Sequence, residues 1–502
     1  MSKQGSADKL ASRGYNVGHL LALVAPVIIY LATLAFYRLF LHPLARFPGP
    51  KLAAASRWYE AYYDVVQNGQ YAFQIKEMHK KYGPIVRISP YELHINDAVF
   101  FEKLYGYDGP WDKYAWAVDA HSAPGAMIFT PSHDLHRARR QPLNAFFSKA
   151  RVTKRLDLVE RKVTRLCERI AEFAGTGRVL DVDAAISAFQ HDVSTDYVLG
   201  KDHQYLEGDF AASKSRPPQN TRNSSALVAL PQKFLIKKAD EKTAKFIKYI
   251  RTQRLMQIAT SSAPDDTEPQ TIVHEIINSS LPPEEKTMKR VFTDVATVTG
   301  AGFETTASVL RLIIYYVSSD AAILQRLRDE LAQAAASEPG GDLALRTYEQ
   351  LPFLTAVLME GLQLSPGIGG RSPRIAPDRE LVYNDKWRIP AGTPVGMTVL
   401  MMHLDETLYP DPYRFSPERW MHPDARKKAE KTFAPFSRGS RMCLGMHLAW
   451  AELYLVVSAL VRKFNFDFTG VEADHFEWAS DQFTIGIKGK SELGALVTSC
   501  VA

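Results

Sequence analysis

The chain has 502 residues, 46% of them hydrophobic, so it can bury a sizeable core in one large domain or in two or three smaller ones. Its formal net charge is +6, and no block of Lys or Arg is long enough to indicate a nucleic-acid-binding arm. The three cysteines, Cys167, Cys443 and Cys500, form no CxxC pair, which argues against a disulfide framework and a zinc site and favours a reducing compartment.

The first predicted element is an apolar segment at about 20–37. It carries no charge and, at about 1.5 Å of rise per residue, can cross most of a thin bilayer core. A cleaved signal peptide is the alternative, but Tyr37 and Arg38 lead into bulky residues and not into a small-residue cleavage site. We therefore expect residues 1–41 to hold an N-terminal tail and one membrane anchor. Because basic residues lie on both sides of the anchor, the expected cytosolic side of the catalytic domain rests on the reducing compartment.

A proline-rich segment, HPLARFPGPKLAA at 42–54, follows the anchor. Its three prolines and one glycine prevent the anchor helix from continuing, so we expect a stiff hinge. The remaining residues, 55–502, are expected to form a catalytic domain that is mostly α within an α+β class. Helical periodicity is expected at 58–79, 151–174, 238–258 and 288–318, strands at 84–89, 92–96, within 381–398 and near the C-terminus, and polar loops at 214–225 and 260–271.

The apolar helical segment at 288–318 contains the sequence AGFETT at 301–306. From the residues alone, Gly300 and Gly302 would allow another helix to cross closely. The segment also places an acid and two hydroxyls within about two helical turns.

A cysteine loop, FSRGSRMCLGMHLAW at 436–450, carries the strongest chemical signal. Gly439 allows a tight turn, and Gly445 removes a side chain where a flat ligand would approach. Cys443 precedes a predicted helix, whose N-terminus would stabilise a thiolate. Phe436 can shield the sulfur, and Arg441 offers a fork for a carboxylate. These features fit the proximal side of an iron porphyrin better than the pocket of a cysteine nucleophile.

At these five residues the chain resembles the cytochrome P450 family, because they match the haem-binding signature F-x-x-G-x-R-x-C-x-G at each defined position. The resemblance implies a large helical domain with a small β-rich region, haem b as cofactor, and Cys443 as the axial ligand of the haem iron. It also implies that AGFETT is the oxygen-activating motif, with Ala301 beside the haem. Thr305 would hold dioxygen and its proton-delivering water, and Glu304 would feed protons inward.

The same resemblance extends to other segments. Arg140, with His136 four residues before it, corresponds to a propionate-binding helix, and Arg374 is a second propionate candidate. Glu360, Gln363 and Arg419 correspond to the E-x-x-R motif and its later arginine, with an amide in place of the first arginine. Gln363 can donate to Glu360 but lacks the guanidinium charge, so Glu360 and Arg419 would carry the network as a simpler pair.

The implied function is that of a haem-thiolate monooxygenase, an oxidoreductase of the EC 1.14 type. Electrons would come from NADPH through a cytochrome P450 reductase, with cytochrome b5 as a further candidate partner, because the chain shows no G-x-G-x-x-G loop of its own. A basic face would receive the reductase, drawn from Arg137, Arg139, Lys427, Lys428, Lys431 and Arg438. No nucleic-acid partner is expected.

The segments YRLFLHPLARFPGPKLAA, KYGPIVRISPYELHI and HLDETLYPDPYRFSPERW resemble fungal enzymes of secondary metabolism, including trichodiene oxygenases. This implies a lipophilic terpenoid, polyketide or alkaloid substrate that is hydroxylated or epoxidised at the endoplasmic reticulum membrane. Two alternatives remain open: a haem-thiolate desaturase, isomerase or dehydratase, and a haem-binding protein whose catalysis is impaired by Gln363.

Overall fold

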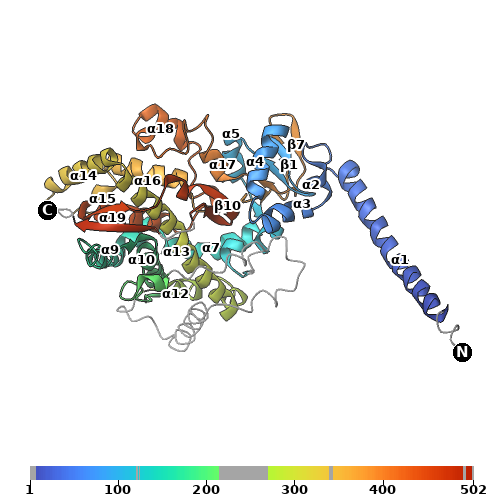
Figure 1. Ribbon diagram of the computed structural model, residues 1–502, viewed down its shortest axis with the longest axis horizontal. Helices are drawn as coiled ribbons and strands as arrows, with labels where there is room; N and C mark the ends of the chain where they lie inside the picture. Colours follow the sequence, from blue (N-terminus) through green and yellow to red (C-terminus); the bar gives the residue numbers. More distant parts are fainter. Residues whose placement is uncertain are drawn as a thin grey trace.

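The computed structural model describes residues 7–119, 123, 125–213, 270–338, 343–489 and 493–499. The loop predicted at 214–225, the helix predicted at 238–258 and most of the loop predicted at 260–271 lie outside the described residues, as does Cys500. Figure 1 shows a broad helical body from which the N-terminal helix α1 projects, with β1 and β7 on the side nearest that helix and β10 in the middle of the view.

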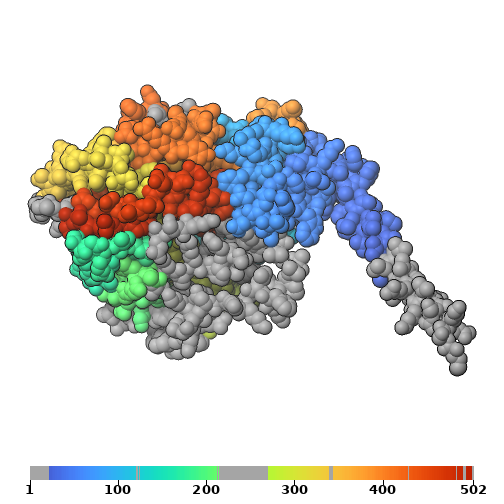
Figure 2. Space-filling model, in the orientation of Figure 1, coloured from blue at the N-terminus to red at the C-terminus, as the bar shows by residue number. Residues whose placement is uncertain are grey.

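The N-terminal helix α1 (Ala7–Phe36) continues into a π-helical turn, η1 (Tyr37–Leu41), and the chain becomes extended at His42. Within it, Ala22–Leu41 has a mean hydropathy of 1.9 and no share of it is buried against the body. Figure 2 shows this blue arm standing clear of the rest of the protein. Its 20 residues correspond to about 30 Å of helix, the thickness of a bilayer core. The helix near the N-terminus can therefore cross a membrane by length and composition, close to the predicted span.

Helices dominate the rest of the described chain. They are α2 (Lys51–Ala55), α3 (Trp58–Ala61), the π-helical η2 (Tyr62–Val66), α4 (Tyr71–Tyr82), α5 (Ala98–Tyr105), α6 (Ala115–Asp119), α7 (His133–Phe146), α8 (Lys149–Lys154), α9 (Leu156–Ala171), α10 (Val182–Leu199), α12 (Ile272–Ile277), α13 (Met288–Ser319), α14 (Ala321–Ala336), α15 (Leu345–Tyr348), α16 (Pro352–Leu364), α17 (Val399–His403), α18 (Pro423–Glu430) and α19 (Met446–Lys463). The predicted helix at 288–318 is confirmed as α13. The helix predicted at 58–79 is interrupted, because Asn68 and Gly69 both take positive φ between η2 and α4.

Strands are short and form several small sheets. One sheet has the order β1-β2-β8-β5-β3, a second β4-β12-β9, and two hairpins pair β6 with β7 and β10 with β11. The bounds are β1 (Ile85–Arg87), β2 (Leu93–Ile95), β3 (Asp112–Lys113), β4 (Leu180–Asp181), β5 (Arg374–Ile375), β6 (Leu381–Tyr383), β7 (Trp387–Ile389), β8 (Val395–Gly396), β9 (Phe464–Phe468), β10 (Trp478–Gln482), β11 (Thr484–Ile487) and β12 (Gly494–Ser499). Only the β2–β8 pair is parallel among these described strands.

The long helix α13 lies at the centre of the main hydrophobic core, in contact with α10, α16 and α19. Local signals fix its neighbours. Asp181 caps the start of α10 by accepting a hydrogen bond from the Ala184 N–H, and Gly200 ends that helix in the left-handed conformation. Pro352 opens α16 at its first turn, where a missing N–H costs no helical hydrogen bond. The central position of α13 holds its AGFETT segment among rigid elements.

Candidate functional site

The cysteine loop folds as a tight turn, as expected. Gly439 has φ +70°, and a Cβ there would collide with the carbonyl oxygens of Tyr105 and Gly106. The Cys443 N–H donates to the Phe436 carbonyl oxygen at 2.8 Å, which closes the loop. The Phe436 ring lies 6.1 Å from that of Trp450 between ring centroids, so it is fixed against α19. The loop is therefore rigid on both sides of the thiol.

The Cys443 thiol combines exposure with depth. Its side chain is exposed, and a Cβ on Gly445 would meet no atom within 4 Å, so open space adjoins the sulfur. Burial nevertheless raises the pKa of the thiol, against smaller lowering effects from the Gly445 N–H and from Arg140. The two observations agree if the sulfur lines an internal space that is deep within the protein. The expected lowering of the thiol pKa by the start of α19 is present but smaller than the effect of burial.

Four cations lie around this space. Arg441 and Arg374 are buried, Lys113 and Arg140 are half-buried, and the sheet register places Lys113 directly opposite Arg374. Burial and the neighbouring cations lower the pKa of Arg441 to about 9 and that of Lys113 well below its ordinary value. Burial also lowers the pKa values of Arg140 and Arg374. Like charges placed opposite each other on strands are destabilising without a counter-ion.

The partners of these cations are mainly backbone oxygens. Arg441 donates to the carbonyls of Thr130 and Pro131 at 2.7 and 2.8 Å, but its Nε has no partner. Lys113 donates to the Ile128 carbonyl at 2.6 Å. None of the four forms an ion pair with a carboxylate in the described part of the chain. Asp112 is the acid that acts on Arg441. A ligand with two carboxylates, such as haem with its propionates, fits this cluster.

Sequence reasoning found three of these cations and missed Lys113. No local pattern marks a single lysine in a loop, and only the β3–β5 pairing brings it to Arg374. His136, predicted beside Arg140, is buried next to the cluster. Burial and then Arg441, Arg140 and Lys113 lower its pKa to about 2, so the imidazole is neutral.

The two glycines of α13 have different environments. A Cβ on Gly302 would collide with the Ser194 side chain of α10, whereas a Cβ on Gly300 would meet nothing within 4 Å. Ala301, although in the middle of a core helix, is exposed. The close helix crossing is therefore present at Gly302 alone, whereas Gly300 and Ala301 border open space.

Thr305 lies where several segments meet. Its hydroxyl donates to the Ala301 carbonyl oxygen at 2.9 Å, and a Cβ on Gly367 would lie 3.4 Å from the Thr305 Cβ. The Gly367 carbonyl accepts from the Ile485 N–H at 3.2 Å, which ties this loop to the β10–β11 hairpin. The Phe483 ring of that hairpin lies 6.2 Å from Phe129 between centroids. Distant segments thus form one wall around Thr305.

Glu304 is held by a bidentate ion pair. Both of its carboxylate oxygens accept from Arg311, at 3.0 and 3.1 Å, and Arg311 also pairs with Asp183 at 2.8 Å. The Glu304 carboxylate is half-exposed, and the ion pair with Arg311 fixes its orientation on α13.

The expected pair of Glu360 and Arg419 is present, and two further donors join it. Arg419 donates through Nε to both Glu360 oxygens, at 3.1 and 2.9 Å, and the Ser416 N–H and Trp420 Nε1 each donate at 2.7 Å. The prediction that Gln363 donates to Glu360 is wrong, because its amide donates instead to the carbonyls of His403 and Pro412. The indole of Trp420 takes the place of the second guanidinium, and the Gln363 Oε1 is left without a partner.

The expected basic face needs one correction. Arg139 is buried and donates to Glu285 at 2.6 and 2.8 Å, because Arg139 lies on the inner side of α7. Arg137, Lys427 and Lys431 are exposed, and Arg438 pairs with Glu102. The Lys428 side chain lies outside the described residues.

Comparison with known proteins gives a consistent picture. The family model described as cytochrome P450 matches residues 59–489. The chain is 37% identical over 489 residues to the cytochrome P450 monooxygenase sdnE of Sordaria araneosa, covering 91% of this chain and 94% of that one. It is 36% identical over 489 residues to the tryptophan 6-hydroxylase fscE of Fusarium equiseti, covering 93% and 95%.

A solved structure supports the fold. The crystal structure of a cytochrome P450 (CYP102L1) superposes with a TM-score of 0.69 at 15% identity and covers 86% of this chain and 94% of its own. The predicted mostly α fold is thereby confirmed. The enzyme is an oxidoreductase that uses haem b and NADPH-derived electrons supplied by a reductase. This chain belongs to the cytochrome P450 family and is a monooxygenase related to fungal enzymes of secondary metabolism.

Proposed function

We propose that Cys443 is the axial thiolate of the haem and that the enzyme hydroxylates or epoxidises a lipophilic intermediate of a fungal biosynthetic pathway. One observation carries the site assignment. The exposed but deep sulfur of Cys443 adjoins both the cleared space at Gly445 and buried cations that lack carboxylate partners. A flat ligand that bears a metal and two carboxylates satisfies all three features.

The chain's own residues would bind and orient this group. Arg441, Arg374 and Lys113 would donate to its carboxylates, with Arg140 and the neutral His136 beside them. Gly300 and Ala301 leave room for its face along α13. Phe436, held against Trp450, would shield the sulfur from water, which would favour the metal-bound thiolate over a protonated thiol. When bound, haem supplies the activation of dioxygen.

Thr305 and Glu304 would handle protons. The Thr305 hydroxyl already donates to the Ala301 carbonyl, so its oxygen can accept a hydrogen bond from a water that carries a proton inward. Glu304 lies at the half-exposed surface and is fixed by Arg311, a position suited to taking protons from solvent.

The substrate would bind among the segments that meet at Thr305. Phe129, Phe483 and the Gly367 loop form an apolar wall there, which suits a lipophilic terpenoid, polyketide or alkaloid. One relative is a tryptophan 6-hydroxylase, which makes an aromatic alkaloid precursor a concrete candidate for binding at this wall.

The N-terminal helix supports a proposed location, and the exposed basic residues support proposed redox partners. The unburied segment Ala22–Leu41 would anchor the protein in the endoplasmic reticulum membrane with the body in the cytosol. Arg137, Lys427, Lys431 and Arg438 would contribute to the face that receives NADPH-cytochrome P450 reductase, and cytochrome b5 is a further candidate for it. We propose three segments along the chain: the tail and membrane anchor at 1–41, the hinge at 42–54 and the catalytic domain at 55–502.

Reconstitution tests the proposed activity. The purified holoenzyme, a reductase and NADPH are incubated with candidate substrates under oxygen-18 gas, and the products are analysed by mass spectrometry. We expect one oxygen-18 atom in each product of a single hydroxylation. Product without the label would favour the isomerase or dehydratase alternative, and oxidation that only removes hydrogen would favour a desaturase. Haem-loaded protein without any turnover would favour the impaired haem-binding protein.

A further inference from the structure

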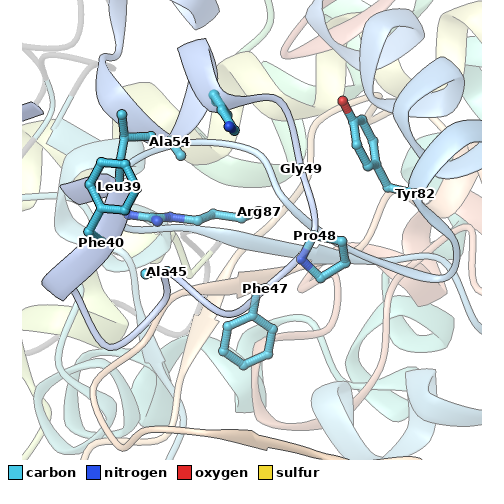
Figure 3. Close-up of a pocket in the computed structure, with 10 residues that line it drawn as sticks. Leu39, Phe40, Ala45, Phe47, Pro48, Gly49, Ala54, Tyr82 and Arg87 are labelled. Atoms are coloured by element: carbon cyan, nitrogen blue, oxygen red, sulfur yellow. The ribbon is translucent and has the colours of Figure 1, made fainter. Parts of the chain in front are cut away.

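A cavity of about 330 Å³ lies where the N-terminal helix joins the body. Its apolar lining comes from the end of that helix and from the hinge, and its polar lining from Lys51, Tyr82 and Arg87; the full set is Leu39, Phe40, Ala45, Phe47, Pro48, Gly49, Lys51, Ala54, Tyr82 and Arg87. Figure 3 shows the Arg87 side chain reaching toward Leu39 and Phe40, with Pro48 beyond it. The volume is that of a site for a small ligand.

The charge in this cavity is positive and uncompensated. No lining residue is acidic, and none of Arg38, Lys51 and Arg87 forms an ion pair in the described part of the chain. Arg87 is 2% exposed, and its two terminal nitrogens donate to the Arg38 and Pro90 carbonyls at 2.8 Å. Its Nε, and that of Arg38, have no partner. A buried guanidinium that lacks a counter-ion is costly, so an anion in the cavity would stabilise it.

The pKa values of Arg87 and His42 are consistent with an excess of positive charge at the cavity. Burial and then Arg38 lower the pKa of Arg87 to about 10. Burial, Arg87 and Arg38 lower the pKa of His42, which keeps that imidazole from adding a further charge. The Lys51 side chain is exposed and makes no hydrogen bond in the described structure, so it is free to close over a ligand.

The position of the cavity identifies the anion. Leu39 and Phe40 belong to the last turn of the apolar segment Ala22–Leu41, whereas residues from Ala45 onward follow the point at which the chain leaves that helix. In a membrane, the cavity therefore lies at the level where the hydrocarbon ends and the lipid headgroups begin. Phe40 and Leu52 are 64% and 71% exposed beside it, as expected for side chains that face acyl chains.

We propose that this cavity binds the phosphate-bearing headgroup of an anionic phospholipid, with Arg87 and Lys51 facing the phosphate and Phe40 against the acyl chains. The site would fix the angle between the anchor helix and the body, because its lining comes from both. This proposal rests on the proposed membrane anchor.

Two matched variants test it. Lys51→Glu and Arg46→Glu make the same change in charge on exposed residues at the same level of the membrane, but Arg46 does not line the cavity. Full-length holoenzyme is placed in nanodiscs of phosphatidylcholine mixed with phosphatidylserine, and the lipids that it retains are identified by native mass spectrometry. We expect selective retention of phosphatidylserine, lowered about fivefold or more by Lys51→Glu and close to wild type for Arg46→Glu.

Three results would overturn the proposal: no preference for phosphatidylserine in the wild type, equal losses in the two variants, or displacement of the lipid by excess inorganic phosphate. Failure of the anchor is seen separately, by flotation with phosphatidylcholine vesicles. If the protein does not float, water-soluble dihexanoyl phosphatidylserine is titrated against the same variants, and absence of a Lys51-dependent affinity again contradicts the headgroup site.

Discussion

Arg371 lies in a loop, and Arg374 lies three residues later at the start of β5. Both side chains are largely shielded from solvent, but the charges around them have opposite signs. Arg371 pairs with Glu60 at 2.6 Å and with Glu92 at 3.4 Å. Burial alone would lower its pKa, but Glu92, Glu60 and Asp64 raise it well above its usual value. Arg374 donates to a backbone carbonyl, that of Ser372, and burial lowers its pKa. Carboxylates of the protein balance the charge of Arg371, whereas no carboxylate among the described residues pairs with Arg374.

The two groups of charges differ in their balance. The group around Arg371 contains Glu60, Glu92 and Asp64, whose pKa burial raises to about 8, and Arg57 also pairs with Glu60, so acids there outnumber cations. The group around Arg374 contains Lys113 and Arg441, so cations there exceed the acids. This excess of buried positive charge near Cys443 supports the proposal that the second group binds the carboxylates of the haem.

The largest effect on stability is expected for Arg371→Gln. The change leaves Glu92 buried without its ion-pair partner and Glu60 with Arg57 alone, and breaking a buried pair typically costs about 3–5 kcal/mol. We expect the free energy of unfolding to fall by this amount, as measured by chemical denaturation, with loss of holoenzyme as a consequence. A stable Arg371→Gln protein with normal haem content would break the comparison.

The same substitution at position 374 sharpens the contrast. Arg374→Gln removes one of the mutually repelling cations, so we expect little loss in the unfolding free energy of the haem-free protein. Haem affinity should fall about tenfold, since one charge-assisted hydrogen bond contributes about 1.5 kcal/mol or more. Transfer of haem to apomyoglobin measures this loss, and Lys113→Gln should give a similar one. Unchanged haem transfer in both variants would show that the cluster does not hold the propionates.

Gln363 provides an intermediate case. Burial raises the pKa of Glu360 to about 7, and Arg419 is its cationic partner. Gln363→Arg would add a second cation within reach of Glu360 and remove the unpartnered Oε1. We expect a gain of about 1–2 kcal/mol in unfolding free energy. Gln363→Leu, the control, should lose about as much, because it leaves the carbonyls of His403 and Pro412 without their donor. A destabilised Gln363→Arg protein would show that the present amide network is the better solution.

Near neutral pH, the smallest expected effect is a pH dependence from His136. Its pKa is lowered from 6.5 to about 2 in the folded protein, so the unfolded chain binds a proton that the folded chain rejects between these values. The stability of the haem-free protein should therefore fall, by about 1.4 kcal/mol for each pH unit below 6.5. Denaturation at successive pH values, compared with His136→Gln, isolates this contribution. Equal slopes for the two proteins would contradict the placement of a neutral imidazole beside the cations.

Local signals in the sequence predicted the mostly helical fold and the turn of the cysteine loop. They did not predict contacts at the candidate site that depend on distant segments. The periodicity of α13 and the turn at Gly439 depend on neighbouring residues, and both were predicted correctly. The role of Lys113 depends on a strand pairing with residues far along the chain, which no local pattern shows. Gln363 was assigned to Glu360 from their spacing on a helix, but carbonyls from a distant loop compete for its amide. Arg139 was assigned to the basic face because the family resemblance places its segment on the thiolate side of the haem, yet Glu285 holds its side chain inside.

The central claim is that Cys443 binds the haem iron as a thiolate, and the spectrum of the reduced, carbon-monoxide-bound protein tests it most directly. We expect the long-wavelength Soret band of thiolate ligation in the wild type, and its loss in Cys443→Ser. A wild-type spectrum that lacks this band although haem is bound, or a Cys443→Ser protein that keeps it, would contradict the assignment.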